Sequence, residues 1–339
     1  IPSLVGSEMC IRDSPGAASE WPSASDRAPE FVGEDPGIVG EAPGIVGEAP
    51  EIVGGLTTAS GEFPFMAALV WRAVPNAKSG LRCGATMVDA EWILTAAHCT
   101  DGYGPHNFDV VVGRDVLSSA AGERIAVAEI HQHDDWNAVT FENDIALLKL
   151  AAPASVGSAI YWATGTLADW FAPGVVAISA GWGITEDDPS GTGNGVQDEM
   201  RKVDLPIRSA EECAASVPSA EFFADAMICA GYEEGGRDAC AGDSGGPLFV
   251  EELGRWRQVG IVSWGYDCAD PPYEGNPTDG SFGFYARLAA FDEWMVATTG
   301  LATCEGAPAT IVGTPGNDTL TGHGRDDVIV GGAGNDLIL

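Results

Sequence analysis

The sequence predicts an all-β protein with a different kind of segment at each end, and three observations lead to this. From residue 52 onward, short apolar runs alternate with clusters of Gly, Pro, Asp and Asn, which is typical of strands joined by turns. Before residue 52 the chain is rich in Pro, Gly and acidic residues, and from residue 313 a nine-residue pattern repeats. Many short strands without intervening helices indicate a β-barrel or a β-sandwich. The runs fall at residues 109–112, 124–130, 145–150, 175–180, 256–264 and 281–288.

Composition limits the class of protein. At 339 residues the chain is long enough for about two domains, each with a core of its own. It carries 16 Lys and Arg against 50 Asp and Glu, a net charge of -34. Such a field disfavours nucleic acid and anionic membranes as partners and attracts cations and cationic substrates. No apolar run approaches the roughly 18 residues that a membrane span needs, so membrane insertion is not expected.

The N-terminal segment, residues 1–51, is predicted to be a disordered pro-segment. A seven-residue repeat begins at Ile38, Ile45 and Ile52, and its Pro and Gly residues prevent regular helix. A plain linker is the alternative. Residues 1–14 resemble a translated sequencing adaptor rather than native sequence. Charged residues interrupt the opening stretch of the chain, so no secretory signal is visible there.

The C-terminal segment consists of three nonapeptides that resemble RTX-type calcium-binding repeats. They span residues 313–321, 322–330 and 331–339, so the repeats cover 313–339 after a linker at 301–312. The third fits the Gly-Gly-x-Gly-x-Asp-x-apolar-x pattern, whereas the second has His323 and Arg325 in place of glycines. The resemblance implies a calcium β-roll in which Asp318, Asp327 and Asp336 supply oxygen ligands. A generic Gly/Asp-rich tail is the alternative, and further repeats are expected beyond the last residue.

Three short motifs carry residue types that nucleophilic catalysis requires. They are Gly242–Pro247, Thr95–Cys99 and Asn143–Leu148, and they contain Ser244, His98 and Asp144. A serine between flexible glycines is open to a substrate carbonyl, but it needs a neighbouring base to become nucleophilic. The chain order His, Asp, Ser is one of those in which this triad occurs. On these motifs, residues 52–300 resemble the trypsin-like (chymotrypsin-fold) serine endopeptidases.

The resemblance implies two packed six-stranded antiparallel β-barrels over residues 52–300, with a C-terminal helix around residues 291–298. His98 and Asp144 would come from the first barrel and Ser244 from the second. The active site would then lie in the cleft between the barrels.

The family's mechanism assigns a role to each of these residues. Ser244 is the nucleophile, His98 is the general base and later the general acid, and Asp144 orients the imidazole. The backbone N–H groups of Gly242 and Ser244 are expected to form the oxyanion hole. This chemistry needs no cofactor, and calcium is expected only at the C-terminal repeats.

The resemblance also implies a substrate preference. Asp238 stands six residues before the nucleophile, where trypsin-like members carry the base of the pocket for P1, the residue preceding the scissile bond. Ser263, Trp264 and Gly265 match one wall of that pocket, and Gly283 matches the opposite wall. Glycine walls leave room for a long side chain, and a buried carboxylate pairs with a cation. Cleavage after Arg or Lys is therefore expected.

The segment Ile52–Gly55 matches the mature N-terminus of the family. Ile52 lies 46 residues before His98, which is near the family spacing. After a cut before Ile52, the new ammonium would pair with Asp243 and order the oxyanion loop. Glu51 occupies the position where most relatives carry Arg or Lys, so a separate activating protease is expected.

The eight cysteines allow many pairings, and sequence alone does not choose among them. The resemblance implies the disulfides Cys83–Cys99, Cys213–Cys229 and Cys240–Cys268, which leaves Cys10 and Cys304. Disulfides indicate an oxidising, extracellular setting. The repeats resemble those of bacterial proteins that a type I channel exports directly.

The leading hypothesis is a secreted, extracellular, bacterial serine endopeptidase that is monomeric and made as a zymogen. It would cleave protein or peptide substrates with basic P1 residues. The alternative is a catalytically silent relative that serves as a calcium-dependent binding or adhesion module. The complete triad favours the enzyme.

Overall fold

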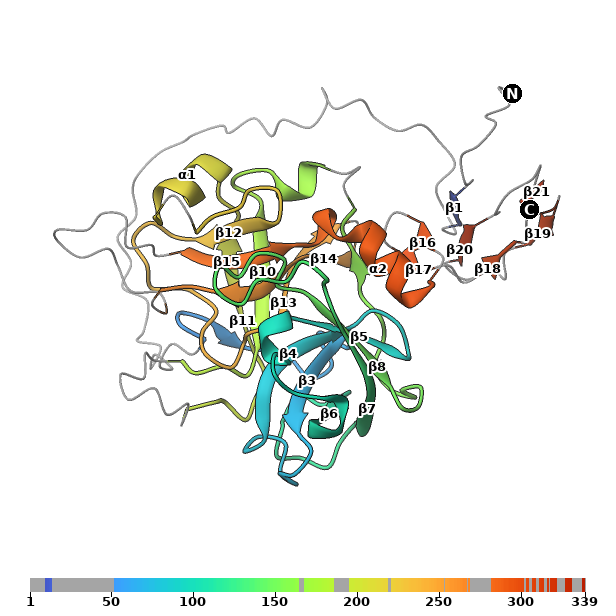
Figure 1. Ribbon diagram of the computed structural model, residues 1–339, viewed down its shortest axis with the longest axis horizontal. Helices are drawn as coiled ribbons and strands as arrows, with labels where there is room; N and C mark the ends of the chain where they lie inside the picture. Colours follow the sequence, from blue (N-terminus) through green and yellow to red (C-terminus); the bar gives the residue numbers. More distant parts are fainter. Residues whose placement is uncertain are drawn as a thin grey trace, which may run out of the picture.

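The structure is a computed structural model, and its described residues form mainly β-strands (Figure 1). It describes residues 10–13, 52–164, 168–185, 195–218, 221–252, 254–266, 268 and 282–301, with short stretches of the tail between 303 and 338. Most of the predicted pro-segment, residues 1–9 and 14–51, lies outside the described residues. The α-helices in the described part are α1 Ala210–Ala215 and α2 Asp292–Thr299. Neither is long and apolar enough to cross a membrane.

The first six core strands close into an antiparallel barrel, drawn in blue to green in the lower part of Figure 1. They are β3 Met66–Trp71, β4 Leu81–Met87, β5 Trp92–Thr95, β6 Phe108–Val112, β7 Glu123–Gln132 and β8 Ala146–Leu150, in the order β3-β4-β5-β8-β7-β6. On β3, Ala67 and Leu69 pack in the barrel core, whereas Ala68 and Val70 pack in a second cluster that includes Phe249 of the other sheet. A strand buried on both faces needs a continuous apolar sequence, as β3 has. β3 therefore joins the two halves of the molecule.

The second half is a curved antiparallel sheet in the order β12-β15-β14-β13-β10-β11. Its strands are β10 Val176–Gly181, β11 Arg201–Pro206, β12 Met227–Gly231, β13 Pro247–Glu252, β14 Arg255–Trp264 and β15 Phe282–Arg287, with β2 Leu56–Thr57 beside β11 and β9 Tyr161–Trp162 parallel to β14. A bridge between Ile207 and Ala230 brings β12 back to the end of β11. Beside this bridge, the Arg208 N–H donates to the Cys229 carbonyl at 2.9 Å. Ser209 then caps α1, accepting a hydrogen bond from the Glu212 N–H.

The expected all-β, double-barrel architecture is confirmed, with one difference in detail. The first barrel is closed, whereas the second is a curved sheet that the Ile207–Ala230 bridge brings together. Each of the six apolar runs overlaps a strand, namely β6, β7, β8, β10, β14 or β15. The C-terminal helix is α2, which Gly300 caps in the left-handed region with φ of 67°.

The three disulfides expected from the resemblance are present. Cys83 pairs with Cys99, Cys213 with Cys229, and Cys240 with Cys268. Short 3₁₀ helices lie at Ala97–Cys99, Pro105–Asn107, Ala168–Phe171 and Leu288–Ala290. The first of these carries both His98 and one end of the first disulfide.

The tail forms short strands whose register gives the geometry of the repeats. They are β16 Thr303–Cys304, β17 Ala307–Pro308, β18 Ile311–Val312, β19 Thr319–Leu320, β20 Asp327–Val330 and β21 Leu337–Ile338, and β1 Cys10–Asp13 pairs antiparallel with β20. In parallel register, Ile311 lies beside Ile329 and Leu320 beside Ile338. Partners are thus 18 residues apart (329 minus 311), or two nonapeptides. One turn of the coil therefore contains two repeats.

Candidate active site

The first barrel brings His98 and Asp144 together. His98 follows β5 and Asp144 precedes β8, and these strands pair with Thr95 opposite Ala146. Asp144 Oδ2 lies 2.7 Å from His98 Nδ1, and Asp144 Oδ1 accepts the backbone N–H of His98 at 2.9 Å. The Asp144 side chain is fully buried. One carboxylate therefore fixes both the ring and the backbone of the histidine.

The second sheet also reaches this carboxylate, through Ser263. The Ser263 hydroxyl, at the end of β14, donates to Asp144 Oδ2 at 2.5 Å. The sequence predicts Ser263 only as part of a pocket wall. The hydrogen bond joins residues 119 positions apart and was missed because no local pattern marks it.

Ser244 lies in a turn that needs glycine on both sides. Gly242 and Gly245 have φ of 100° and 79°, values that side chains other than hydrogen disfavour. The Ser244 carbonyl accepts the Gly84 N–H from β4 at 2.8 Å, which ties the turn to the first barrel. Within the described part of the chain, the N–H groups of Gly242 and Ser244 donate no hydrogen bond. Both residues are half-buried rather than enclosed in the core.

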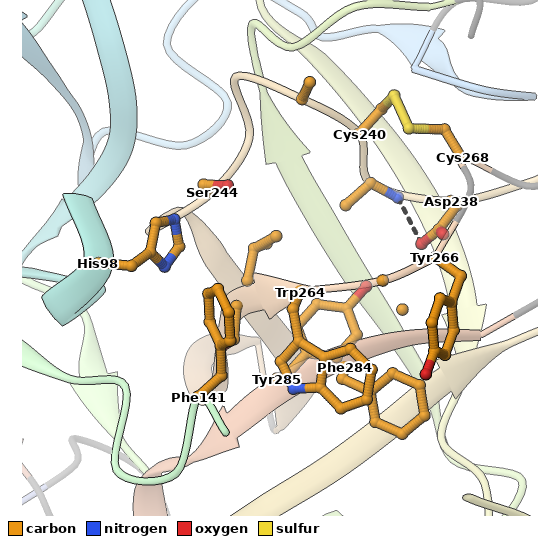
Figure 2. A pocket seen from close by; sticks show the side chains of 16 residues that line it. His98, Phe141, Asp238, Cys240, Ser244, Trp264, Tyr266, Cys268, Phe284 and Tyr285 are labelled. Atoms are coloured by element: carbon orange, nitrogen blue, oxygen red, sulfur yellow. Dashed lines mark hydrogen bonds between the residues drawn. A yellow bond between two sulfur atoms is a disulfide. The ribbon is translucent and has the colours of Figure 1, made fainter. Parts of the chain in front are cut away.

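Ser244 and His98 line one end of a single pocket (Figure 2). Among the described residues, no hydrogen bond joins the two side chains, and His98 Nε2 lies 3.6 Å from Cys99 Sγ. Catalytic hydrogen bonds are often long in the free enzyme and shorten when substrate binds. The structure therefore brings the three residues of the predicted triad to one place, but the hydrogen bond between Ser244 and His98 is not formed.

The pocket has a volume of about 420 Å³, and Asp238 lies at the end away from His98 (Figure 2). All five residues predicted for the substrate pocket line it, namely Asp238, Ser263, Trp264, Gly265 and Gly283. Asp238 is 2% exposed. A Cβ on Gly283 would lie only 2.6 Å from Asp238 Oδ1, whereas one on Gly265 would meet nothing closer than 4.0 Å. Glycine at 283 is thus a steric requirement of the carboxylate.

Sequence reasoning missed Tyr285, Phe141 and Tyr266, which also line the pocket. The Tyr285 hydroxyl is buried and has no hydrogen-bond partner among the described residues. Burial, together with the charges of Asp238 and Asp243, holds the pKa of Tyr285 well above its ordinary value. Alternation along β15 from Gly283 could have placed Tyr285 on the pocket face.

Asp243 is a buried carboxylate with backbone partners. Its oxygens accept the N–H groups of Gly183 at 2.7 Å and Cys240 at 3.0 Å. Burial raises its pKa to about 6, although these two hydrogen bonds act in the opposite direction. In the part of the chain that the structure describes, no Lys or Arg side chain is bonded to it.

In the uncut chain, Ile52 is already packed in the hydrophobic core of the second half of the molecule. It is 0% exposed and packs in the same core as Tyr285. The next residue, Val53, accepts the Asp238 N–H through its carbonyl at 3.2 Å. The segment predicted to be the mature N-terminus is therefore docked against the loop that carries Asp238.

The described residues offer one cluster with metal-ligand chemistry, Cys83, His98 and Cys99. Its sulfurs form a disulfide, so they supply no thiolate. Of the predicted calcium ligands, Asp318 is described before β19, Asp327 begins β20, and Asp336 lies outside the described residues.

Comparison with known proteins agrees with this geometry. The trypsin family matches residues 52–295, and the RTX calcium-binding nonapeptide repeat family matches residues 310–338. Trypsin eta of Drosophila erecta is 35% identical over 72% of this chain and 88% of its own length. Trypsin-1 of Astacus astacus is 36% identical over 67% of this chain and 94% of its own length. The chain belongs to the trypsin family of serine endopeptidases.

Proposed function

We propose that this trypsin-family endopeptidase cleaves protein substrates after Arg or Lys, and the observation that carries the proposal is the buried carboxylate of Asp238 in the pocket. Glycine, small and aromatic residues make up most of the lining, and Asp238 lies at the end of the pocket away from His98 (Figure 2). A cation entering such a pocket loses its hydration, so it binds well only where a counter-charge meets it. Arg and Lys are the side chains long enough to carry a cation to Asp238.

We infer that Ser244 attacks the substrate carbonyl while His98 removes its proton. Asp144 holds Nδ1 at 2.7 Å, which leaves Nε2 as the basic nitrogen. The same ring then returns the proton to the leaving amine, and water repeats the sequence on the acyl-enzyme. The N–H groups of Gly242 and Ser244 would stabilise the oxyanion, each donor lowering the barrier by roughly 3 to 4 kcal/mol.

The P1 preference is tested with a peptide library and the variant Asp238→Ser. Cleavage after Arg and Lys should fall by about 10⁴-fold in kcat/KM, because the substrate cation would be buried without a counter-charge. Asp225→Ser, at an exposed acid on the same half of the molecule, is the matched control. An enzyme that prefers Phe, Leu or Glu at P1, or an Asp238→Ser variant that keeps its preference, would contradict the proposal.

Activation by a cut between Glu51 and Ile52 is proposed as well. It is supported by the buried Asp243, which has backbone donors and a raised pKa but no bonded cation in the described residues. A new ammonium at Ile52 would supply one. The cut would come from another protease, because an acidic P1 residue would face Asp238.

Calcium binding by the tail, secretion and a monomeric state complete the proposal. The 18-residue register, with Thr319 beside Leu337, supports a coil in which the first and third repeats occupy equivalent positions and Asp327 lies half a turn away. Disulfides in the peptidase domain support an extracellular setting.

Labelling with a fluorophosphonate probe distinguishes an active serine peptidase from the alternative, a catalytically silent binding module, which would remain unlabelled.

A further inference from the structure

The 3₁₀ helix that carries His98 ends in carbonyl groups that its own short backbone does not satisfy. This is expected, because the last carbonyls of any helix lack partners within it. Thr100 donates to the Ala97 carbonyl through both its N–H and its hydroxyl. The next two carbonyls, of His98 and Cys99, accept from the guanidinium of Arg82, at 3.3 Å from Nη2 and 3.1 Å from Nε.

Arg82 is itself held in place. It lies in β4, next to Cys83, whose disulfide reaches Cys99. Its guanidinium lies over the Trp71 ring, 5.6 Å from the centroid. Trp71 in turn packs edge-on against Tyr103 with ring centroids 4.9 Å apart. Two neighbouring residues of one strand thus hold the helix, one through a covalent bond and one through two charged hydrogen bonds.

We infer that Arg82 is a positioning residue for the catalytic histidine. Asp144 fixes the ring of His98 and its N–H, on the N-terminal side of the residue. Arg82 fixes the carbonyl, on the C-terminal side. Without Arg82 the peptide after His98 can rotate, and the ring loses its fixed distance to Ser244. Misplacing a reacting group by about 1 Å can reduce the rate about 100-fold.

This inference goes beyond the proposed function, because it concerns the base and not the P1 pocket. It does not depend on which side chain precedes the scissile bond. It depends only on the activity that the trypsin family shares.

The chain contains a matched control for the chemistry of Arg82. Arg114, in the loop after β6, also donates to two backbone carbonyls, to Ala121 at 2.7 Å and Leu117 at 3.1 Å. Like Arg82 it is half-buried. Neither Arg114 nor its acceptors line the pocket. Loss of either guanidinium removes two hydrogen bonds of the same kind, but only one pair holds the catalytic helix.

The experiment compares Arg82→Met, Arg82→Lys and Arg114→Met in the active enzyme, with active sites counted by fluorophosphonate titration. Methionine keeps an apolar stem over Trp71 and removes the donors. We expect Arg82→Met to lower kcat about 10- to 100-fold with KM within about twofold, and Arg82→Lys to recover part of the loss. Arg114→Met should leave kcat within about twofold while lowering the melting temperature as much as Arg82→Met does.

A kcat within twofold of the parent for Arg82→Met would overturn the inference, and so would an equal loss in Arg114→Met. A loss that vanishes once active sites are counted would also overturn it, because it would show misfolding alone. If Arg82→Met does not fold, Arg82→Lys decides: parent-like kcat contradicts the role and a reduced kcat at unchanged KM supports it. P1 preference, read on the same substrates, should not change. A parent enzyme without preference for Arg or Lys would refute the proposed function and leave this result intact.

Discussion

Asp243 should make the stability of the uncut chain fall as pH rises through the range of its titration. The carboxyl group has an ordinary pKa of 3.8, and burial raises it to about 6 in the folded chain. Below about pH 4 it is protonated in both the folded and the unfolded state. Between pH 4 and 6 the folded chain keeps a proton that the unfolded chain releases, so the free energy of unfolding decreases with pH. Above about pH 6 both states are ionised and the loss is complete.

The size of the effect follows from the two values. They differ by about 2, and one pKa unit corresponds to about 1.4 kcal/mol, so the loss is about 3 kcal/mol. This is a large part of the roughly 5 to 15 kcal/mol that stabilises a typical domain. The group is fully buried, so solvent screening does not reduce the figure substantially.

The assay is urea unfolding of the uncut chain between pH 4 and 7.5, with Ser244→Ala in every protein to prevent self-cleavage. The variant Asp243→Asn should lack the decrease, so its difference from the parent should change by about 3 kcal/mol across this range. Asparagine also loses one acceptor for the Cys240 N–H, but that cost does not depend on pH. Asp225→Asn, at an exposed acid on the same half of the molecule, is the control for removing one carboxylate at the surface.

A difference between parent and Asp243→Asn that stays constant with pH would refute the reasoning, because the carboxyl would then titrate alike in both states. Repeating the comparison on the cut chain gives a second test. With the Ile52 ammonium beside it, the pKa of Asp243 should fall below its ordinary value. Stability from the pair would then be present above that value and lost as pH falls.

Three further predictions follow from the site and the tail. Ser244→Ala should lower turnover by about 10⁶-fold with an unchanged melting temperature, and hydrolysis within tenfold of the parent would contradict the triad. Treating the precursor with a glutamyl endopeptidase should produce activity together with a new N-terminus at Ile52, and full activity before treatment would exclude the zymogen mechanism. Millimolar calcium should slow cleavage after Arg325 when trypsin is added to the Ser244→Ala chain, and an unchanged rate would count against calcium binding in this tail.

The sequence points to the candidate triad and pocket residues that the structure brings together, because the chemistry proposed for them restricts them to few residue types. Gly242 and Gly245 are required by positive φ, and Gly283 by the close approach of Asp238. Such constraints leave a local signature in the chain. Contacts that depend on how distant strands meet leave none, which is why the link from Ser263 to Asp144 was not foreseen.

The same distinction holds for the fold. The period of nine in the tail is visible in the sequence, but the 18-residue register follows from how strands stack, so the equivalence of the first and third repeats appears only in the structure. Strand β3 is not among the runs from which the sequence predicts strands, and its position between two cores depends on the packing of distant strands. The Ile207–Ala230 bridge between the ends of β11 and β12 likewise depends on how distant strands meet, so strand patterns do not report it.

Strand β4 connects these observations, because three consecutive residues on it touch both halves of the catalytic machinery. Arg82 holds the carbonyl of His98, Cys83 is bonded to the residue after it, and the Gly84 N–H binds the carbonyl of Ser244. A Cβ on Gly84 would lie 2.9 Å from the backbone of Gly246, so only glycine allows the nucleophile turn to approach this closely. The base and the nucleophile come from different sheets, and their separation is set where both meet one strand. Substitutions in β4 should therefore alter catalysis without touching the substrate.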